Sequence, residues 1–316
     1  MNELELIKKI SQLIPDNSYI GDDTAYLEEL GIVVTTDTLV EDVHFRLNTT
    51  TPYNLGYKSM AVNLSDIASD GAIPSYAFVS LSLPKYIDEN FVEEFYKGMN
   101  ELCAKYGVII AGGDVTGSEK LFINITVIGK TNGLYPARRS NAKVGDIVIT
   151  TGFSGLSRAG FELLENPKKY NDMPDTIREK FILAHQKPTP YIELGRKILE
   201  KSQTAPAMMD TSDGLADGLF KIAQKSRVEI EIDKNLIPID KDLEKIAGEK
   251  TFEWVLFGGE DYTLLACVNE KTAEELSSEV HIIGKVTDNN PTGVVKIIPD
   301  MVITEETLIN KAFKHF

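Results

Sequence analysis

Acidic residues follow glycines or apolar runs at five places along the chain, and carboxylates in such positions can bind divalent cations. Loops at the ends of buried strands carry function in α/β proteins because a rigid scaffold positions them. Carboxylates that converge there without basic partners raise one another's pKa, and Mg2+ relieves that repulsion while holding substrate phosphates. The five segments are Gly21-Asp22-Asp23, Thr35-Thr36-Asp37, Gly112-Gly113-Asp114, Asp210-Thr211-Ser212-Asp213-Gly214 and Gly258-Gly259-Glu260-Asp261. Together they predict one Mg2+–nucleotide site assembled from the whole length of the chain.

Each segment also has a plain structural interpretation when it is taken alone. Gly21-Asp22-Asp23 is typical of a turn, and Ser212 or Asp213 could cap the helix that follows them. The number of such segments favours a common site over coincidence. Gly112-Gly113 allow close backbone approach to a phosphate, and Gly214 opens a helix whose N-terminus favours anions. The Walker A and protein-kinase signatures are absent, so the nucleotide fold is neither a P-loop nor a protein kinase.

The segments around these motifs predict a mixed α/β protein. Ile32–Thr36 is typical of a buried strand, Tyr76–Leu83 alternates like a strand, and residues 52–69 form an apolar stripe with helical spacing. Asp66 and Asp70 are spaced i, i+4 on the polar side of that predicted helix. The order of elements favours mixed sheets over a strict βαβ repeat.

A polar segment without periodicity, Ala137–Gly145, predicts a boundary between two domains. A length of 316 residues is enough for two domains. We therefore expect an N-terminal domain over residues 1–137 and a C-terminal domain over residues 138–316 that completes the site.

Charge and composition exclude several classes of partner. The chain has 33 Lys and Arg against 48 Asp and Glu, a net charge of −15, which argues against binding nucleic acid or an anionic membrane surface. Cys103 and Cys267 lack metal-ligand spacing and are typical of buried thiols in a reducing cytosol. No apolar run reaches about 18 residues, and the N-terminus does not resemble a signal peptide. We expect a cytoplasmic protein.

Three further features have two interpretations each. His44, seven residues after Asp37, is either a structural hydrogen-bonding group or a ligand contact. Arg138-Arg139 follow a turn and either lie in solvent or hold a phosphate of ATP. Phe313 either packs the C-terminal tail or contacts a ligand.

Taken in order, the motifs resemble those of the thiamine-monophosphate kinase family. The matching segments are Gly21–Ala25, Thr35–Phe45, Asn63–Asp66, Gly112–Thr116, Arg139-Ser140, Asp210–Leu215, Phe257–Tyr262 and Phe313–Phe316. They cover nearly the whole chain. The resemblance implies the two-domain fold of the aminoimidazole-ribonucleotide synthetase superfamily, in which the N-terminal domain pairs its sheet with that of a second copy. ATP and several Mg2+ ions would bind in a cleft at the interface of this homodimer.

The implied reaction is phosphorylation of thiamine monophosphate by ATP, the last step of thiamine diphosphate biosynthesis. The attacking group is a phosphate oxygen that is already ionised at neutral pH, so we expect no residue to act as general base or nucleophile. Positioning and charge neutralisation supply the rate of such transfers, and clustered Mg2+ ions reduce the repulsion between the two anions. We expect direct in-line transfer without a phosphoenzyme.

The resemblance also implies roles residue by residue. The implied Mg2+ ligands are Asp22, Thr35, Thr36, Asp37, Asp66, Asp114, Asp210 and Asp213. The implied ATP contacts are Tyr96, Gly113, Asp114, Arg139 and Ser212. The implied contacts to thiamine monophosphate are His44, Glu260 and Phe313, with Phe313 stacking on the aromatic rings. The choice between Asp22 and Asp23 and that between Arg139 and Arg138 stay open, and Asp70 stands where the family has an apolar or neutral residue.

Two other functions are the alternatives. One is another ATP-dependent synthetase of the superfamily, of the aminoimidazole-ribonucleotide or selenophosphate type; the other is a non-catalytic nucleotide-binding protein. Selenophosphate synthetases carry a reactive Cys or selenocysteine near the N-terminus, whereas the first cysteine here is Cys103 in a predicted helix. The segment Phe257–Asp261 and the surroundings of His44 favour the kinase, and the intact set of acidic residues favours catalysis.

Overall fold

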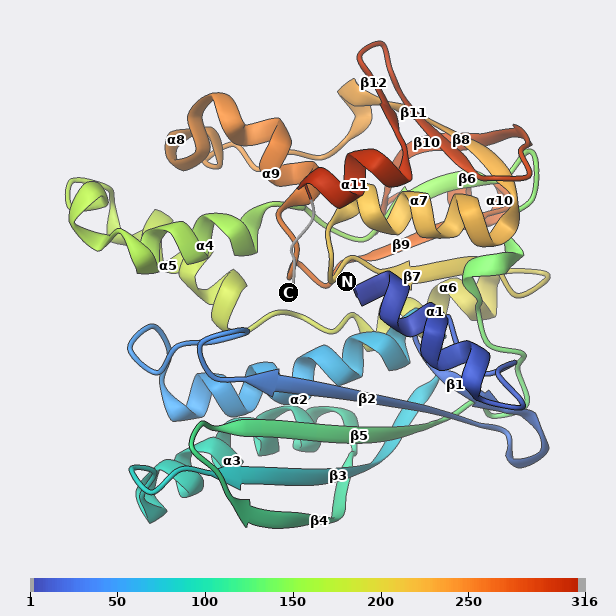
Figure 1. Cartoon of the computed structure of the whole chain (residues 1–316). Coiled ribbons are helices and arrows are strands. Elements are labelled where there is room, and N and C mark those ends of the chain that lie inside the picture. The colour runs from blue at the N-terminus through green and yellow to red at the C-terminus, as the bar shows by residue number, and fades with distance from the viewer. Residues whose placement is uncertain (1–2, 312–316) are drawn as a thin grey trace.

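A five-stranded sheet forms the N-terminal half of the protein in the computed structural model, which describes residues 3–311 (Figure 1). Helix α1 (Glu3–Leu13) precedes this sheet along the chain. The strands of this sheet are β1 (Ala25–Leu27), β2 (Ile32–Val40), β3 (Ile73–Leu83), β4 (Ile109–Gly117) and β5 (Phe122–Lys130). In space they follow the order β1-β2-β5-β3-β4, with β3 and β4 parallel and the other neighbours antiparallel.

Two long helices, α2 (Pro52–Ser69) and α3 (Glu89–Tyr106), cover one face of this sheet. They approach each other closely because glycines lie at their contact. A Cβ atom on Gly56 would lie 1.9 Å from the carbonyl oxygen of Phe95, and Gly98 on α3 faces α2 in the same way. A side chain at either position would force the two helices apart.

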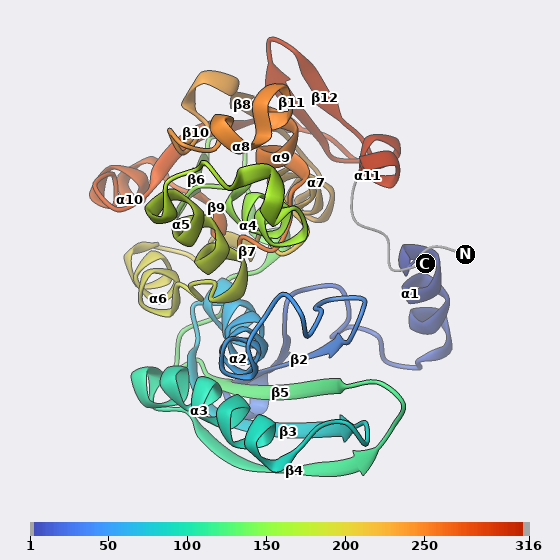
Figure 2. The same ribbon diagram turned by 90° about the vertical axis from the view of Figure 1, so that its left-hand side faces the viewer.

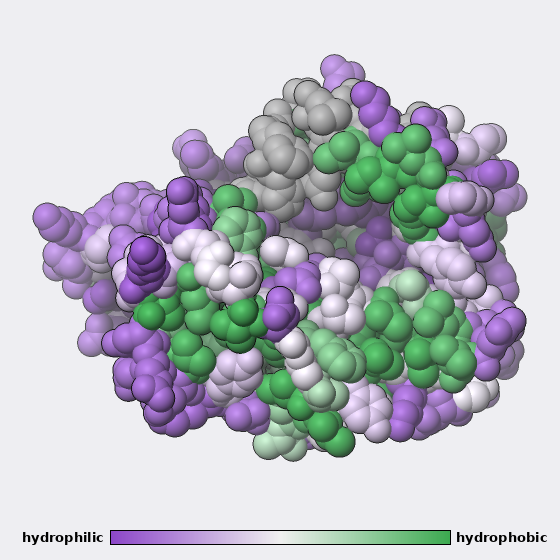
Figure 3. All heavy atoms as spheres, turned by 60° about the horizontal axis from the view of Figure 1, so that its bottom comes forward, coloured by the Kyte–Doolittle hydropathy of each residue, from purple (hydrophilic) through white to green (hydrophobic). Residues whose placement is uncertain are grey.

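The other face of the sheet carries exposed apolar side chains. Tyr76, Phe78 and Phe122 point away from the helices and are each about two-fifths exposed. The edge strand β4 is more open still, with Val115 exposed to 64% and Ile109 to 58%. Figure 3 shows groups of apolar residues, separated by hydrophilic ones, on the underside of the molecule. Large exposed apolar surfaces are typical of interaction sites.

The second sheet has seven strands and is mostly antiparallel. Its strands are β6 (Ile147–Thr150), β7 (Ala207–Asp210), β8 (Val228–Asp233), β9 (Leu264–Val268), β10 (His281–Asn289), β11 (Val294–Ile298) and β12 (Met301–Ile303). Their order is β12-β11-β8-β10-β6-β9-β7, and of these pairs β8 and β11 run parallel. The helices of this half are α4 (Leu156–Glu165), α5 (Asp175–Gln186), α6 (Ile192–Lys201), α7 (Leu215–Ser226), α8 (Glu244–Ala247), α9 (Thr251–Phe257), α10 (Glu270–Glu275) and α11 (Glu305–Lys311).

Helix α2 lies between the two halves and is buried on nearly all sides (Figure 2). Met60 and Leu64 of α2 share one hydrophobic core with Ile125 of β5, Met208 of β7 and Leu264 of β9. A helix buried in this way can carry polar residues only where they find partners, so its polar side chains point to a site.

The predicted elements lie where the sequence patterns placed them. Ile32–Thr36 falls in β2, residues 52–69 coincide with α2, and Tyr76–Leu83 falls in β3. The domain boundary after residue 137 stays a prediction, because one core joins residues from both sides of it. Within residues 3–311, no helix has the length and apolar character needed to cross a lipid bilayer.

Candidate functional site

Three aspartates from distant parts of the chain converge at the junction of the two sheets. Asp23, Asp66 and Asp210 each place one carboxylate oxygen so that the three atoms lie within 4.8 Å of one another. Asp23 lies in the loop before β1, Asp66 is in the last turns of α2, and Asp210 ends β7. Two of the five acidic segments therefore meet here, through Asp23 and Asp210, together with Asp66 of α2, and Asp23 rather than Asp22 is in the closest group.

Hydroxyl groups orient these carboxylates. The Thr35 hydroxyl donates to Asp66 at 2.5 Å. The Ser65 hydroxyl donates to Oδ2 of Asp210 at 2.7 Å, and the Ser212 hydroxyl donates to its Oδ1 at 2.9 Å. The backbone N–H of Ser212 also donates to Oδ1, at 3.3 Å, and because Asp210 is 1% exposed these three donors replace water.

The side chain of Asp37 belongs to the same face of β2 as Thr35, because alternate residues of a strand share a face. The backbone N–H of Asp37 donates to the side-chain oxygen of Asn63 on α2 at 3.1 Å. Thr36, between them, points to the opposite face, where its hydroxyl contacts the Asn124 amide and the Thr126 hydroxyl at 3.1 Å each. The Thr36 side chain is thus directed away from the carboxylates, and its implied metal contact stays a prediction.

The convergence raises the pKa of three carboxyl groups, those of Asp37, Asp66 and Asp210. Burial, together with the charge of Asp23, raises the pKa of Asp210 to about 7. Burial and the charges of Asp23 and Asp213 raise the pKa of Asp37 to about 6. Burial and Asp37 raise the pKa of Asp66 well above its usual range. Groups this strongly perturbed are typical of functional sites.

Basic side chains lie at the margin of the cluster. The Arg139 guanidinium contacts Asp23, and its Nε lies 3.8 Å from Asp22. On α7, Lys221 pairs with Asp213 at 2.8 Å. Asp22 and Asp213, both implied metal ligands, therefore lie next to the closest group but are already partly neutralised.

The cluster fits a hard cation. Its donors are carboxylate and hydroxyl oxygens, the ligands that Mg2+ prefers in proteins. Oδ2 of Asp23 is buried and has no hydrogen-bond partner among the described residues, so it is available as a ligand. An additional positive charge would also relieve the repulsion that raises the pKa values here.

Three of the implied ATP contacts lie elsewhere in the chain. Asp114 and Gly113 are on β4, three positions from β2 in the sheet, which corresponds to roughly 14 Å. Gly113 is tightly packed, since a Cβ there would lie 1.8 Å from the carbonyl oxygen of Val79. Tyr96 is on α3 and packs against the N-terminal core. The fold of one chain does not bring these residues to the carboxylates.

Glu260 lies in a second polar group and is about one-third exposed. Its backbone adopts a φ of +57°, and its N–H donates to the carbonyl oxygen of Ser212 at 2.6 Å. The buried Lys58 of α2 pairs with Oε1 of Glu260 at 2.8 Å, and Nδ1 of His185 lies 3.5 Å from Oε2. Burial alone would raise the pKa of Glu260, but Lys58 and His185 outweigh it and lower that pKa. Glu260 is held as an anion in one orientation.

His185 and Asp261 support this region in different ways. His185 contacts the Ser157 hydroxyl at 2.9 Å, and burial next to Lys58 lowers its pKa to about 3. Asp261 accepts hydrogen bonds from the backbone N–H groups of Gly155 at 2.6 Å and of Ser157 at 2.9 Å. It therefore caps the N-terminus of α4 and leaves Glu260 as the acidic residue of its motif that faces the site.

His44 accepts a hydrogen bond at Nδ1 from the backbone N–H of Val40 at 3.0 Å, and it lies within electrostatic range of Glu260. The histidine thus has both a structural contact and a position near the second polar group. Phe313 lies outside the described residues, so its implied contact stays a prediction.

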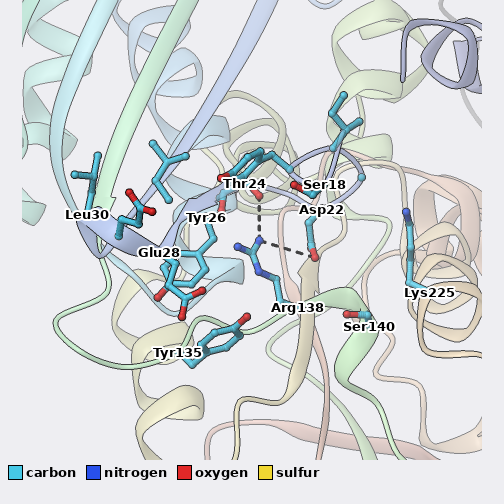
Figure 4. A pocket seen from close by; sticks show the side chains of 15 residues that line it. Ser18, Asp22, Thr24, Tyr26, Glu28, Leu30, Tyr135, Arg138, Ser140 and Lys225 are labelled. Carbon is cyan, nitrogen blue, oxygen red and sulfur yellow. Dashed lines mark hydrogen bonds and ion pairs between the residues drawn. The ribbon is translucent and has the colours of Figure 1, made fainter. Parts of the chain in front are cut away.

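An open pocket of about 710 Å³ lies beside the loop that carries Asp22 (Figure 4). Tyr26 and Tyr135 form an edge-to-face pair on one side, with ring centroids 5.3 Å apart. The Arg138 guanidinium lies over the Tyr26 ring, and Lys225 is on the opposite wall. The pocket borders the carboxylate cluster and shares Asp22 with it.

Comparisons with known proteins show the family to which this chain belongs. The description "AIR synthase related protein, N-terminal domain" matches residues 21–131, and the corresponding C-terminal domain matches residues 143–296. The thiamine-monophosphate kinase of Bacillus subtilis (strain 168) is 39% identical over 334 aligned residues, which cover 100% of each chain. The chain belongs to the thiamine-monophosphate kinase family. A second member of the family, from Aquifex aeolicus (strain VF5), is 37% identical and covers 83% of each chain.

Solved structures of this kinase family have the same fold. A structure described as AaThiL complexed with AMPPCP and TMP superposes with a TM-score of 0.87 at 33% identity, covering 100% of this chain and 97% of the other. The thiamine-monophosphate kinase of Stenotrophomonas maltophilia K279a has a TM-score of 0.76 at 29% identity and covers 93% and 95%. The family predicted from the motifs, and the mixed α/β fold that it implies, are confirmed.

Sequence reasoning missed several residues of this kinase-family site. Lys58 carries a signal, since it is a charged residue within a largely buried helix, whereas Asn63 lay in a matching segment but was given no role. His185 has no sequence signal, because a long stretch of chain separates it from its partner Glu260. Lys221 has none either, because its position in the sequence is that of an ordinary helix-surface lysine.

Proposed function

We propose that this protein is a thiamine-monophosphate kinase, which transfers the terminal phosphoryl group of ATP to thiamine monophosphate and releases thiamine diphosphate and ADP. The convergence of Asp23, Asp66 and Asp210 is the observation that supports this most. Such a group of carboxylates suits a reaction between two phosphate-bearing ligands joined by metal ions. The full-length kinase relatives and the AaThiL complex with AMPPCP and TMP support the same reaction.

The residues that would hold Mg2+ are those of the closest group, Asp23, Asp66 and Asp210, with Asp22 and Asp37 beside them. Mg2+ bound there would neutralise phosphate charge, so that the two anionic ligands can approach each other. The chain itself supplies fixed oxygens, oriented by Thr35, Ser65 and Ser212. Asp213, also implied as a metal ligand, would complete the coordination, and Asp114 would contribute only from a second copy of the chain.

The chain also offers groups that can hold the phosphates of ATP. The Arg139 guanidinium is fixed against Asp23, and its Nε is buried without a hydrogen-bond partner among the described residues. Helix α7 begins after Gly214, next to Ser212, so its N-terminal N–H groups face the same region. These groups orient ATP and attract its charge, and none of them needs to exchange a proton.

Glu260 is the group best placed to recognise the organic part of thiamine monophosphate. Its anionic carboxylate can accept a hydrogen bond from the aminopyrimidine or face the thiazolium cation. Lys58 and His185 fix its orientation, and His44 lies in the same environment. Phe313 is proposed to stack on the rings, as the family resemblance implies.

We further infer that the protein acts as a homodimer. Tyr96, Gly113 and Asp114 lie on α3 and β4, away from the carboxylates of their own chain. A second copy seated on the exposed face of the N-terminal sheet would cover the apolar residues there, and could bring these three residues to the neighbouring site. Light scattering tests this inference, and a stable monomer of 35.0 kDa at micromolar concentration would contradict it.

A cytoplasmic location suits this proposal, since ATP is available there. Cys103 and Cys267 are both buried and unpaired, as expected of a protein kept in a reducing compartment.

ATP consumption, measured with and without thiamine monophosphate, tests the proposed reaction. We expect ADP and thiamine diphosphate to form in equal amounts, only when thiamine monophosphate is present, and to cease when EDTA removes Mg2+. ATP hydrolysis that does not depend on thiamine monophosphate, or consumption without thiamine diphosphate, would contradict it.

A further inference from the structure

A buried ion pair ties the loop that carries Asp22 to the end of α2. Asp70 follows α2 directly and is 0% exposed. Nη1 of Arg138 lies 3.6 Å from its Oδ2, and the Thr24 hydroxyl donates to the same oxygen. The other oxygen, Oδ1, is buried and has no hydrogen-bond partner among the described residues. Asp70 thus depends on Arg138 as its nearby cation.

Arg138 also faces a second carboxylate. Its Nη1 lies 3.9 Å from Oδ2 of Asp22 and donates to the carbonyl oxygen of Thr24 at 3.0 Å (Figure 4). The backbone N–H of Arg139 contacts the other oxygen of Asp22 at 3.4 Å. One guanidinium is therefore shared between Asp70 and Asp22, and the distances show that it closes on neither.

This sharing matters because Asp22 borders the closest group of carboxylates. A guanidinium in direct contact with Asp22 would neutralise it and compete with a metal ion for its oxygens. Asp70 competes for the same guanidinium nitrogen, since Nη1 lies 3.6 Å from Asp70 and 3.9 Å from Asp22, and so it opposes that movement. The Tyr26 ring, over which the Arg138 guanidinium lies, further limits where it can go.

We propose that Asp70 is a positioning residue that holds Arg138 away from Asp22 and so keeps Asp22 available to a divalent cation. The proposal rests on the proposed function, since it assumes that Mg2+ binds at the carboxylate cluster. A merely structural Asp70 would instead affect stability and leave the affinity for Mg2+ unchanged.

The test measures binding rather than turnover. Isothermal titration of the full-length protein with a non-hydrolysable ATP analogue, at a series of Mg2+ concentrations, gives the Mg2+ concentration for half-maximal binding. We expect D70N to raise that concentration about tenfold, the size expected when a unit charge closes from a near to a direct contact in a partly screened site. In the double variant D70M/R138M both charges are absent, so the value should return to that of the wild type or fall below it.

Asp242→Asn is the matched control. Asp242 is also a largely buried aspartate in ion pairs, with Lys180 at 2.8 Å and Lys245 at 2.6 Å, but it lies outside the carboxylate cluster. Its replacement should lower the melting temperature without changing the Mg2+ requirement.

Three results would overturn the proposal. An unchanged Mg2+ requirement in D70N would show that Asp70 does not protect Asp22. If D70N does not fold, the double variant decides alone, and a requirement above that of the wild type counts against the proposal. Analogue binding to the wild type that is independent of Mg2+ would overturn the proposed metal function as well, which distinguishes the two failures.

Discussion

Replacing Asp210 by Asn should stabilise the metal-free protein at about pH 8 while nearly abolishing phosphoryl transfer. Asp210 is 1% exposed, and burial next to Asp23 raises its pKa to about 7 from a usual 3.8. Between these two pKa values, the Asp210 carboxyl holds a proton in the folded protein that it has released in the unfolded chain. Stability therefore falls as the pH rises from about 4 to about 7, and the full penalty is present above pH 7.

The magnitude follows from the difference between the two pKa values, which corresponds to roughly 4 kcal/mol. Asn keeps an oxygen for the Ser212 hydroxyl, and its amide can donate to Ser65, whose hydroxyl can turn from donor to acceptor. Two hydrogen bonds to a charged group become neutral ones, at about 1 kcal/mol each. We expect a net gain of about 2 kcal/mol, or about 4–8 °C in melting temperature.

Asp261→Asn is the matched comparison, because burial also raises the pKa of Asp261 to about 7. Its two oxygens accept from the backbone N–H groups of Gly155 and Ser157, which cannot reverse their roles. The amide of Asn would face one of these donors, so this variant should melt below the wild type.

Melting curves of the wild type and both variants in EDTA, at about pH 8 and about pH 5, test the predicted stabilities. Turnover at saturating Mg2+ tests the predicted loss of phosphoryl transfer. The gain of the Asp210 variant should shrink at about pH 5, where the wild-type carboxyl is already protonated. A lower melting temperature than the wild type at about pH 8, or near-normal turnover, would refute the reasoning.

Three further predictions concern the substrate end of the site. Lys58→Met should raise KM for thiamine monophosphate and leave KM for ATP nearly unchanged, because Glu260 loses its paired cation. Steady-state kinetics with each substrate varied separately measures both constants. Equal effects on the two constants would mean that Lys58 only supports the fold. The pKa of His185 is lowered to about 3, so the protein should become less stable as the pH falls below about 6.5, because the histidine then binds a proton in the unfolded chain but not in the folded protein. Denaturant unfolding of the wild type and of His185→Gln at several pH values checks this. The dependence of unfolding free energy on pH should be weaker in the variant. Phe313→Ala should raise KM for thiamine monophosphate by a factor corresponding to roughly 0.5–1.5 kcal/mol, and a fall in melting temperature with both constants unchanged would mean that Phe313 only packs the tail.

Local patterns were sufficient where one strand or one motif decides the outcome. Asp66 and Asp210 were expected together from the family resemblance, and the structure brings their oxygens within 4.8 Å of Asp23. The period of two in a strand already implies that Thr35 and Asp37 share a face and that Thr36 does not.

Adjacent residues in loops could not be separated in this way. Asp22 and Asp23 are chemically identical, and the path of the loop before β1 decides which one faces Asp66. The same holds for Glu260 and Asp261, of which one points to the site and the other caps α4. Loop backbones have no fixed period, so side-chain direction follows from tertiary contacts.

The sequence by itself determined the family and the mixed α/β class and predicted a cation site, because these depend on residue types and on short-range periodicity. The tertiary structure decided which carboxylates meet, and it placed Lys58 and His185 around Glu260 and Arg138 between Asp22 and Asp70. Those arrangements join residues that are far apart in the chain across the two sides of α2. Their energies depend on distance and burial, which exist only once the two sheets have packed around that helix.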